Sequence, residues 1–113
     1  MKTKKLHCGD IYYVDLGEYS QNIQGGIRPC LILGNEKSLN NSNICQVIPL
    51  TASKKTWLPV HIFINLSKRS TLLLEQIQTV NQNRIQTYIS TLSQDTLMEI
   101  ENKLLFQLGF KQA

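Results

Sequence analysis

One stretch joins a glycine-rich bend to a short apolar run: Gln24-Gly25-Gly26-Ile27-Arg28-Pro29-Cys30-Leu31-Ile32-Leu33. Two adjacent glycines let the backbone bend tightly and approach a bound group closely. The bend delivers Arg28 to the start of a run that is typical of a buried β-strand. Arginine is permanently charged and presents a planar fork suited to phosphate. Taken alone, the stretch fits equally well a turn before an edge strand that carries a solvated arginine.

The composition predicts one small domain, residues 1–113, with a modest core, because 42% of the 113 residues are hydrophobic. No run approaches the roughly 18 apolar residues of a membrane span. Residues 1–8 are basic and lack the apolar segment of a secretory signal, so we expect a frayed terminus and a cytoplasmic protein. The net charge of +4 suits an anionic partner, either nucleic acid or an acidic peptide.

The three cysteines are Cys8, Cys30 and Cys45, and their spacing is not that of a metal site. Cys30 and Cys45 lie in apolar strand patterns, which favours small buried side chains in a reducing compartment. A cysteine nucleophile is the alternative. We find no pattern that predicts a metal ion or another cofactor.

Short strand patterns recur along the chain and are separated by turn residues, which predicts a small barrel or sandwich. The polar segment 17–26 is long for a hairpin connection, which suggests that it is functional. Pro49 indicates a strand edge or bulge. The expected architecture is a mainly β barrel of about six short, mostly antiparallel strands, at residues 10–16, 29–33, 44–50, 60–66, 71–80 and 86–92.

The C-terminal segment 93–109 has the pattern of one amphipathic helix. Ser93 is placed to cap its start, and Gly109 is placed to end it. A stripe at helical spacing predicts the face that packs on the sheet: Leu97, Ile100, Leu104 and Leu108.

Four motifs in order resemble the MazF/PemK family, the RNA-cleaving toxins of type II toxin–antitoxin systems, also called mRNA interferases. They are residues 9–16, Gln24-Gly25-Gly26-Ile27-Arg28-Pro29, Thr51-Ala52-Ser53 and residues 72–79, and the resemblance runs from Gly9 to Phe110. It implies an SH3-like, CcdB-like barrel that forms homodimers and cleaves single-stranded RNA. It also implies a cognate, MazE-like antitoxin whose disordered, often acidic tail blocks the same groove.

The resemblance identifies Arg28 and Thr51 as the catalytic residues of a metal-independent endoribonuclease. In this reaction the ribose 2′-hydroxyl attacks the adjacent phosphorus, so the protein must manage protons and stabilise negative charge. A guanidinium has a pKa above about 12, which favours phosphate binding by Arg28 over proton transfer. The Thr51 hydroxyl can donate to a phosphoryl oxygen or relay a proton.

Further residues are expected at the RNA-binding surface, either by resemblance or by their chemistry. Lysines follow a phosphate backbone, a tryptophan stacks on bases, and amides read base edges. The alternatives are a solvated loop position for Gln24, a folded-back lid for Trp57, a structural role for His61, and strand contacts for Glu75 and Gln76. The set is Gln24, Gly25, Gly26, Ser53, Lys54, Lys55, Trp57, Leu58, Pro59, His61, Ser70, Glu75 and Gln76.

The chain departs from many relatives at Asn22-Ile23, where they carry Ser-Glu. Such positions are expected to set sequence preference, so the RNA motif is not predicted. Two other functions remain open. One is a non-catalytic toxin of the same fold that poisons DNA gyrase, although such toxins lack the Gln-Gly-Gly-x-Arg-Pro and Thr pairing. The other is an SH3-like module that binds RNA or peptide without cutting it.

Overall fold

The structure is a computed structural model that describes residues 5–52 and 61–111. In chain order its elements are β1 (Asp10–Asp15), β2 (Ile27–Leu33), α1 (Glu36–Asn41), β3 (Ile44–Thr51), β4 (His61–Asn65), β5 (Arg69–Leu73), the 3₁₀ turn η1 (Leu74–Gln76), β6 (Gln78–Asn81), the 3₁₀ turn η2 (Gln82–Arg84), β7 (Ile85–Thr91) and α2 (Gln94–Gln107). The strands form one antiparallel sheet in the order β4-β5-β3-β2-β1-β7, and β6 also pairs with β3.

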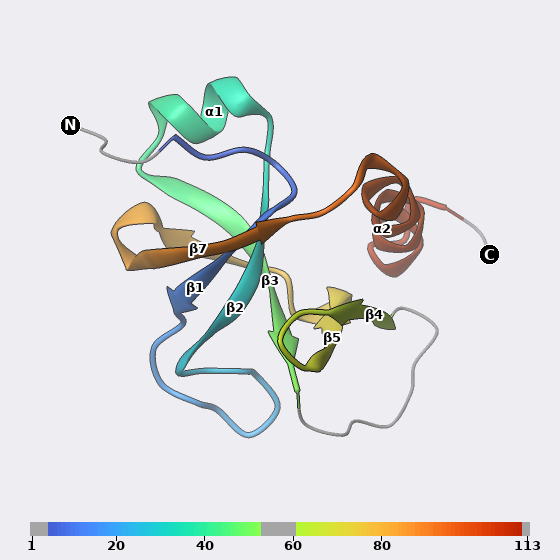
Figure 1. Ribbon diagram of the computed structural model, residues 1–113, viewed down its shortest axis with the longest axis horizontal. Helices are drawn as coiled ribbons and strands as arrows, with labels where there is room; N and C mark the ends of the chain where they lie inside the picture. The colour runs from blue at the N-terminus through green and yellow to red at the C-terminus, as the bar shows by residue number, and fades with distance from the viewer. Residues whose placement is uncertain (1–4, 53–60, 112–113) are drawn as a thin grey trace.

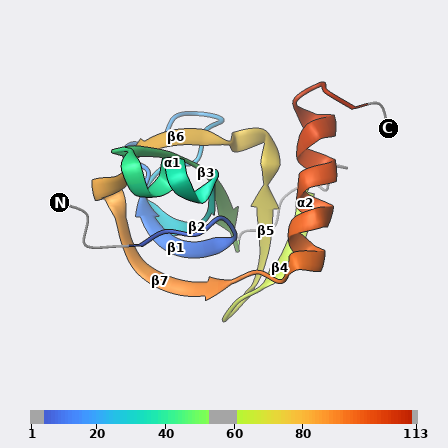
Figure 2. The same ribbon diagram turned by 90° about the horizontal axis from the view of Figure 1, so that it is seen from above.

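The sheet curls so strongly that β1, β6 and β7 surround an interior, while α2 lies beside β4 and β5 (Figures 1 and 2). This arrangement confirms the expected fold class, a small and mainly β curled sheet with a C-terminal helix. No helix in the described part of the chain is long and apolar enough to cross a membrane.

The strand expected over residues 71–80 is in fact two strands separated by η1. Both pair with the same side of β3: β5 at Leu50 and Thr51, and β6 from Ile44 to Val47. Residues 48 and 49 lie between these two ladders and have no register partner on that side in the described sheet. Pro49, which has no N–H to donate, is tolerated inside β3 at this gap.

Both faces of the central strands are buried, which explains their nearly continuous apolar sequences. Along β3, Cys45 and Val47 belong to the cluster inside the curl, whereas Ile48 and Leu50 belong to a second cluster. The second cluster is covered by α2, whose Ile100 is 2% exposed. Burying such a side chain contributes about 1.5–3 kcal/mol, so docking of α2 is part of the core.

The ends of α2 follow the local signals in the sequence. The Ser93 side chain accepts a hydrogen bond from the Thr96 backbone N–H, which caps the first turn. Gly109 has a φ of 86°, and its N–H and that of Phe110 donate to Phe106 and Leu105 to close the last turn. The predicted stripe is wrong at Leu108, which is 48% exposed because it lies past the part of α2 that covers the sheet.

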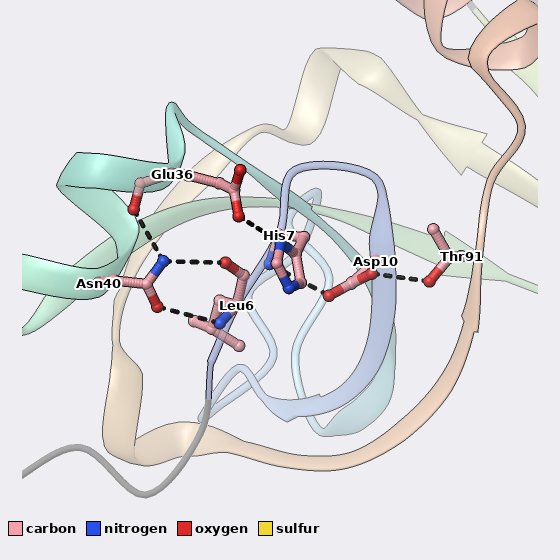
Figure 3. A network of polar contacts seen from close by, with 6 residues as sticks. All are labelled: Leu6, His7, Asp10, Glu36, Asn40 and Thr91. Carbon is pink, nitrogen blue, oxygen red and sulfur yellow. Dashed lines mark hydrogen bonds and ion pairs between the residues drawn. The ribbon is translucent and has the colours of Figure 1, made fainter.

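The expected frayed terminus does not extend through residues 5–8. Leu6 is 1% exposed, and its backbone N–H and C=O both bond to the Asn40 side-chain amide, at 3.2 and 3.3 Å. The next residue, His7, contacts Glu36 through its ring and donates its backbone N–H to Asp10 (Figure 3). Residues 1–4 lie outside the described chain.

The helix α1 was not among the elements expected from the sequence, which placed only a connection between the strands at 29–33 and 44–50. Asn35 caps this short helix by accepting a hydrogen bond from the Ser38 N–H at 2.8 Å. Leu39 on its inner face is buried in the cluster inside the curl. A helix of only six residues with an asparagine cap is a weak signal in the sequence. The burial of Leu39 in the core is what stabilises this helix.

Candidate active site

The pairing of β2 with β3 brings Arg28 and Thr51 to adjacent strands. The antiparallel register runs from Leu33 opposite Gln46 to Cys30 opposite Pro49. Continued by two residues, it sets Arg28 opposite Thr51. Side chains directly opposite each other share a face of the sheet, with Cβ atoms about 5 Å apart. The register therefore favours one shared site for the two residues, although they are far apart in the sequence.

The Arg28 guanidinium is held from the side by the loop that precedes it. Its Nε donates to the Gly25 carbonyl oxygen at 3.0 Å, and its Nη2 donates to the Tyr19 hydroxyl at 2.7 Å. The Tyr19 ring also lies near the charge, with 5.6 Å between the guanidinium carbon and the ring centroid. The other guanidinium N–H groups make no hydrogen bond to residues 5–52 or 61–111, which leaves capacity for an anion.

The loop of residues 17–26 is closed at its neck and packed on itself. The Gly26 N–H donates to the Gly17 carbonyl at 2.7 Å. A Cβ at Gly25 would lie only 2.5 Å from the Tyr19 backbone nitrogen, so another side chain does not fit there. Gly26 has a φ of 75°, in the left-handed region that favours glycine. The two glycines thus allow the loop to bring Tyr19 over Arg28.

The Gln76 side chain connects η1 to this loop. Its Oε1 accepts from the Gln24 backbone N–H at 2.7 Å, and its Nε2 donates to the Asn22 carbonyl at 3.1 Å. The sequence pattern predicts one strand over residues 71–80, with Glu75 and Gln76 inside it. The structure corrects this to a 3₁₀ turn, which points their side chains at neighbouring segments.

Glu75 pairs with His61 at the start of β4. The distance between Glu75 Oε2 and His61 Nε2 is 3.1 Å, and the His61 side chain is 4% exposed. The other carboxylate oxygen of Glu75, Oε1, is buried and has no hydrogen-bond partner among the residues described. This geometry supports the structural alternative for His61, since a ring enclosed in this way has little contact with solvent.

The structure does not bring every expected residue to the site. Thr51 is 4% exposed, and it pairs with Thr71 on β5. Ser70, next to Thr71, therefore faces the other side of the sheet, and its hydroxyl donates to the Lys68 carbonyl at 3.2 Å. Several expected RNA-binding residues lie outside the described chain: Ser53, Lys54, Lys55, Trp57, Leu58 and Pro59.

The cysteines near the site are buried, as expected. Cys30 is fully buried, and burial raises the pKa of its thiol to about 12, with Arg28 pulling the pKa down and Cys45 adding to the rise. Such a thiol stays protonated at neutral pH, which argues against a cysteine nucleophile at this position. Cys8 is exposed, and Cys45 is buried. Residues 5–52 and 61–111 contain no group of three or more metal-binding side chains.

Comparison with known proteins identifies the family of this chain. Residues 7–108 match the PemK-like, MazF-like toxins of type II toxin–antitoxin systems. The sequence is 34% identical over 110 residues to the Endoribonuclease MazF of Staphylococcus epidermidis, and the match covers 92% of each protein. The chain therefore belongs to this toxin family, and the expected class of enzyme, an endoribonuclease, is confirmed at the level of the family.

Solved structures share the fold. MazF from Deinococcus radiodurans superposes with a TM-score of 0.82 at 21% identity, covering 94% of this chain and 98% of the other. A mycobacterial endoribonuclease, solved in complex with its cognate antitoxin, superposes with a TM-score of 0.76 at 21% identity, covering 93% and 96%. At these identities the likeness confirms the fold.

Tyr19 contacts Arg28 and was not among the site residues expected from the sequence. The only signal for it was the length and polarity of the loop of residues 17–26 that carries it.

Proposed function

We propose that the protein cleaves single-stranded RNA without a metal ion and that Arg28 and Thr51 are its catalytic residues. The ribose 2′-hydroxyl attacks the adjacent phosphorus, and the 5′-oxygen of the next nucleotide leaves. The 5′-oxygen takes up a proton, so the first products are a 2′,3′-cyclic phosphate and a 5′-hydroxyl end, and water can then open the cyclic phosphate to a 3′-phosphate. The observation that supports this most is the β2–β3 register, since its extension by two residues beyond Cys30 and Pro49 sets a cationic fork opposite a hydroxyl.

Arg28 has the role of binding the phosphate and stabilising its extra negative charge in the transition state. A guanidinium with a pKa above about 12 does not readily give up a proton, so charge stabilisation is its stronger role. The contacts to Gly25 and Tyr19 fix its plane before RNA arrives. Thr51 donates its hydroxyl to a phosphoryl oxygen or relays a proton.

The partners follow from family membership and charge. We expect the protein to work in the cytoplasm as a homodimer and to be inhibited by a cognate antitoxin. An acidic, disordered tail is a suitable inhibitor because the chain carries a net charge of +4 and because Arg28 offers an anion site. We assign RNA contacts to Gln24, Gly25 and Gly26 in the loop, and to the segment 53–59, whose lysines and tryptophan suit RNA.

The test is cleavage of a long unstructured RNA in EDTA by the wild type, Arg28→Ala and Thr51→Val. We expect discrete cuts by the wild type and almost none by either variant. Arg69→Ala is the matched control, since Arg69 stacks on Phe63, with 4.4 Å between the guanidinium carbon and the ring centroid. Cutting that needs added Mg²⁺, or that survives Arg28→Ala, would overturn the assignment.

The other functions predict different results from the same proteins. An RNA-binding or peptide-binding module would retain RNA without producing new ends. A gyrase poison would leave RNA intact and inhibit DNA supercoiling. Mapping the RNA ends, together with a supercoiling assay, therefore distinguishes the three functions.

A further inference from the structure

A chain of hydrogen bonds connects η1 to the guanidinium of Arg28. It starts at Gln76, whose two amide ends hold the backbone of Gln24 and Asn22. It continues through the loop to the Gly25 carbonyl, which accepts from Arg28 Nε at 3.0 Å. Gln24 and Gly25 are adjacent, so a shift of the segment that Gln76 holds also moves the acceptor of Arg28.

Both polar ends of the Gln76 amide face the protein. The Oε1–N distance of 2.7 Å to Gln24 is short for a hydrogen bond of this type. The Nε2 group donates to the Asn22 carbonyl at the same time, so one side-chain amide bonds the backbone of the loop at two points. The two bonds fix the amide to the loop, and this arrangement favours a loop-holding role over the RNA-contact role that the sequence suggested.

Tyr19 is the second contact that orients Arg28. Its hydroxyl accepts from Arg28 Nη2 at 2.7 Å, on a different nitrogen from the one that Gly25 uses. Two acceptors on two nitrogens fix both the position and the plane of the fork. The Tyr19 side chain comes from the same loop and lies close to Gly26, where an added Cβ would be 3.0 Å from the Tyr19 hydroxyl oxygen and would crowd the ring.

We propose that Gln76 and Tyr19 are positioning residues: Gln76 holds the loop, and the loop, through Gly25 and Tyr19, sets the guanidinium of Arg28. This inference rests on the proposed catalytic role of Arg28. Pre-set charges stabilise a transition state without the cost of reorganisation, whereas a displacement of about 1 Å can cost about 100-fold in rate. Neither residue needs to touch RNA in this arrangement.

The first experiment follows hydrogen exchange in the free protein and needs no RNA. In Gln76→Ala we expect the Gln24 amide to exchange at least about tenfold faster and the NMR signal of the Arg28 Nε proton to broaden or vanish. Gln46→Ala is the matched control, because Gln46 bonds Thr79 on the sheet, at 3.2 Å. Unchanged exchange and an unchanged Arg28 signal in Gln76→Ala would overturn the role of Gln76, whatever the protein does to RNA.

The second experiment separates positioning from RNA contact by kinetics. Tyr19→Phe keeps the ring and removes the acceptor, so we expect kcat to fall about fivefold to tenfold with KM changed by less than about twofold. Tyr88→Phe is the control, since that exposed hydroxyl bonds Thr91 at 2.8 Å, away from Arg28. A rise in KM with kcat unchanged would instead make Tyr19 an RNA contact and overturn its positioning role.

A conservative variant checks that Gln76 acts through its amide. Gln76→Glu keeps an acceptor for the Gln24 N–H but loses the donor to Asn22, so its loss of kcat should lie between the wild type and Gln76→Ala. An equal loss of kcat in the Glu and Ala variants, with normal exchange at Gln24, would show that the side chain acts on RNA. If no variant cleaves RNA, the exchange data still test the positioning of Arg28.

Discussion

Two polar networks lie toward the two ends of β1, and they differ in how many of their hydrogen-bonding groups are already used. At the start of β1, Asp10 is 4% exposed, and its two carboxylate oxygens accept from the Thr91 hydroxyl at 2.7 Å and from the His7 N–H at 3.1 Å (Figure 3). Toward the other end, Val14 pairs with Arg28.

The network around Arg28 is only partly satisfied within the protein. The contacts of Arg28 with Gly25 and Tyr19 leave further guanidinium N–H groups without a hydrogen-bond partner among the described residues. Within η1, beside Gln76 in the sequence, Glu75 bonds His61 and has a buried oxygen without a described partner. Closed networks stabilise a fold, because each buried group recovers the hydrogen bonds that it loses from water. An open network retains groups for a ligand. This difference agrees with the proposal that one end of the small sheet is structural and the other is the RNA-cleaving site.

The largest effect should come from Arg28→Ala. We expect RNA cleavage to fall about 1000-fold, as expected when a positioned charge at the reacting group is removed. Thermal unfolding should change little, because the two loop contacts of the half-buried Arg28 are its main described bonds. The measurements are single-turnover cleavage and a thermal melt. A large fall in melting temperature would mean that the functional end also holds the fold together.

Asp10→Ala should have the opposite pattern. Removing the carboxylate leaves the Thr91 hydroxyl and the His7 N–H without their acceptor, so we expect a loss of about 2–3 kcal/mol in the free energy of unfolding. Cleavage per folded molecule should stay within about twofold. Denaturant unfolding measures the first quantity, and Asp10→Asn, which keeps one acceptor, should lose less. A strong loss of cleavage by a fully folded variant would show that the networks at the two ends of β1 are coupled.

Alkaline pH should test the burial of the Cys30 thiol, two residues from Arg28 in β2. The pKa of Cys30 is raised by burial from 9.0 to about 12, so the folded state holds a proton that the unfolded chain releases. The associated stability is complete below about pH 9 and should fall by about 1 kcal/mol per pH unit as the pH rises toward 12. Unfolding measured from pH 8 to 11 should show this decline, and Cys30→Ala should show a shallower one. Equal slopes would place the titration elsewhere.

Glu75→Gln should have the smallest effect. One oxygen of Glu75 bonds His61, and an amide can replace that contact, while the other oxygen has no described partner to lose. We expect the free energy of unfolding to change by less than about 1 kcal/mol. Comparison with Asp10→Asn in the same denaturant series measures how closed each network is. A larger loss for Glu75→Gln would reverse the distinction between them.

Features set by nearby residues could be predicted from the sequence. Ser93 and Gly109 act within one turn of α2, so both ends of the helix were placed correctly. The strand patterns of β1, β2 and β3 were also clear, because long apolar runs are required where both faces are covered. The exposure of Leu108 could not be predicted, because its position in the helical stripe does not show where the sheet beneath the helix ends.

The candidate site was predictable only in part. The glycines and Arg28 stand together in the sequence, and the family motif adds Thr51. The roles of Tyr19 and Gln76 depend on contacts across 9 and 52 residues of sequence, which no local pattern encodes. The break at η1 likewise arises because two successive strands share β3, and so Gln76 faces the loop rather than lying in a strand.

The sequence by itself determined the family, the mainly β class, the limits of the last helix and the two residues expected to act on RNA. Those properties depend on local conformational preferences and on the order of motifs. Only the tertiary structure decided that residues 5–8 are anchored, that β2 and β3 are adjacent strands, and that Gly25 and Tyr19 contact the Arg28 guanidinium. These depend on strand register and on hydrogen bonds between distant segments, which form only when the chain has folded.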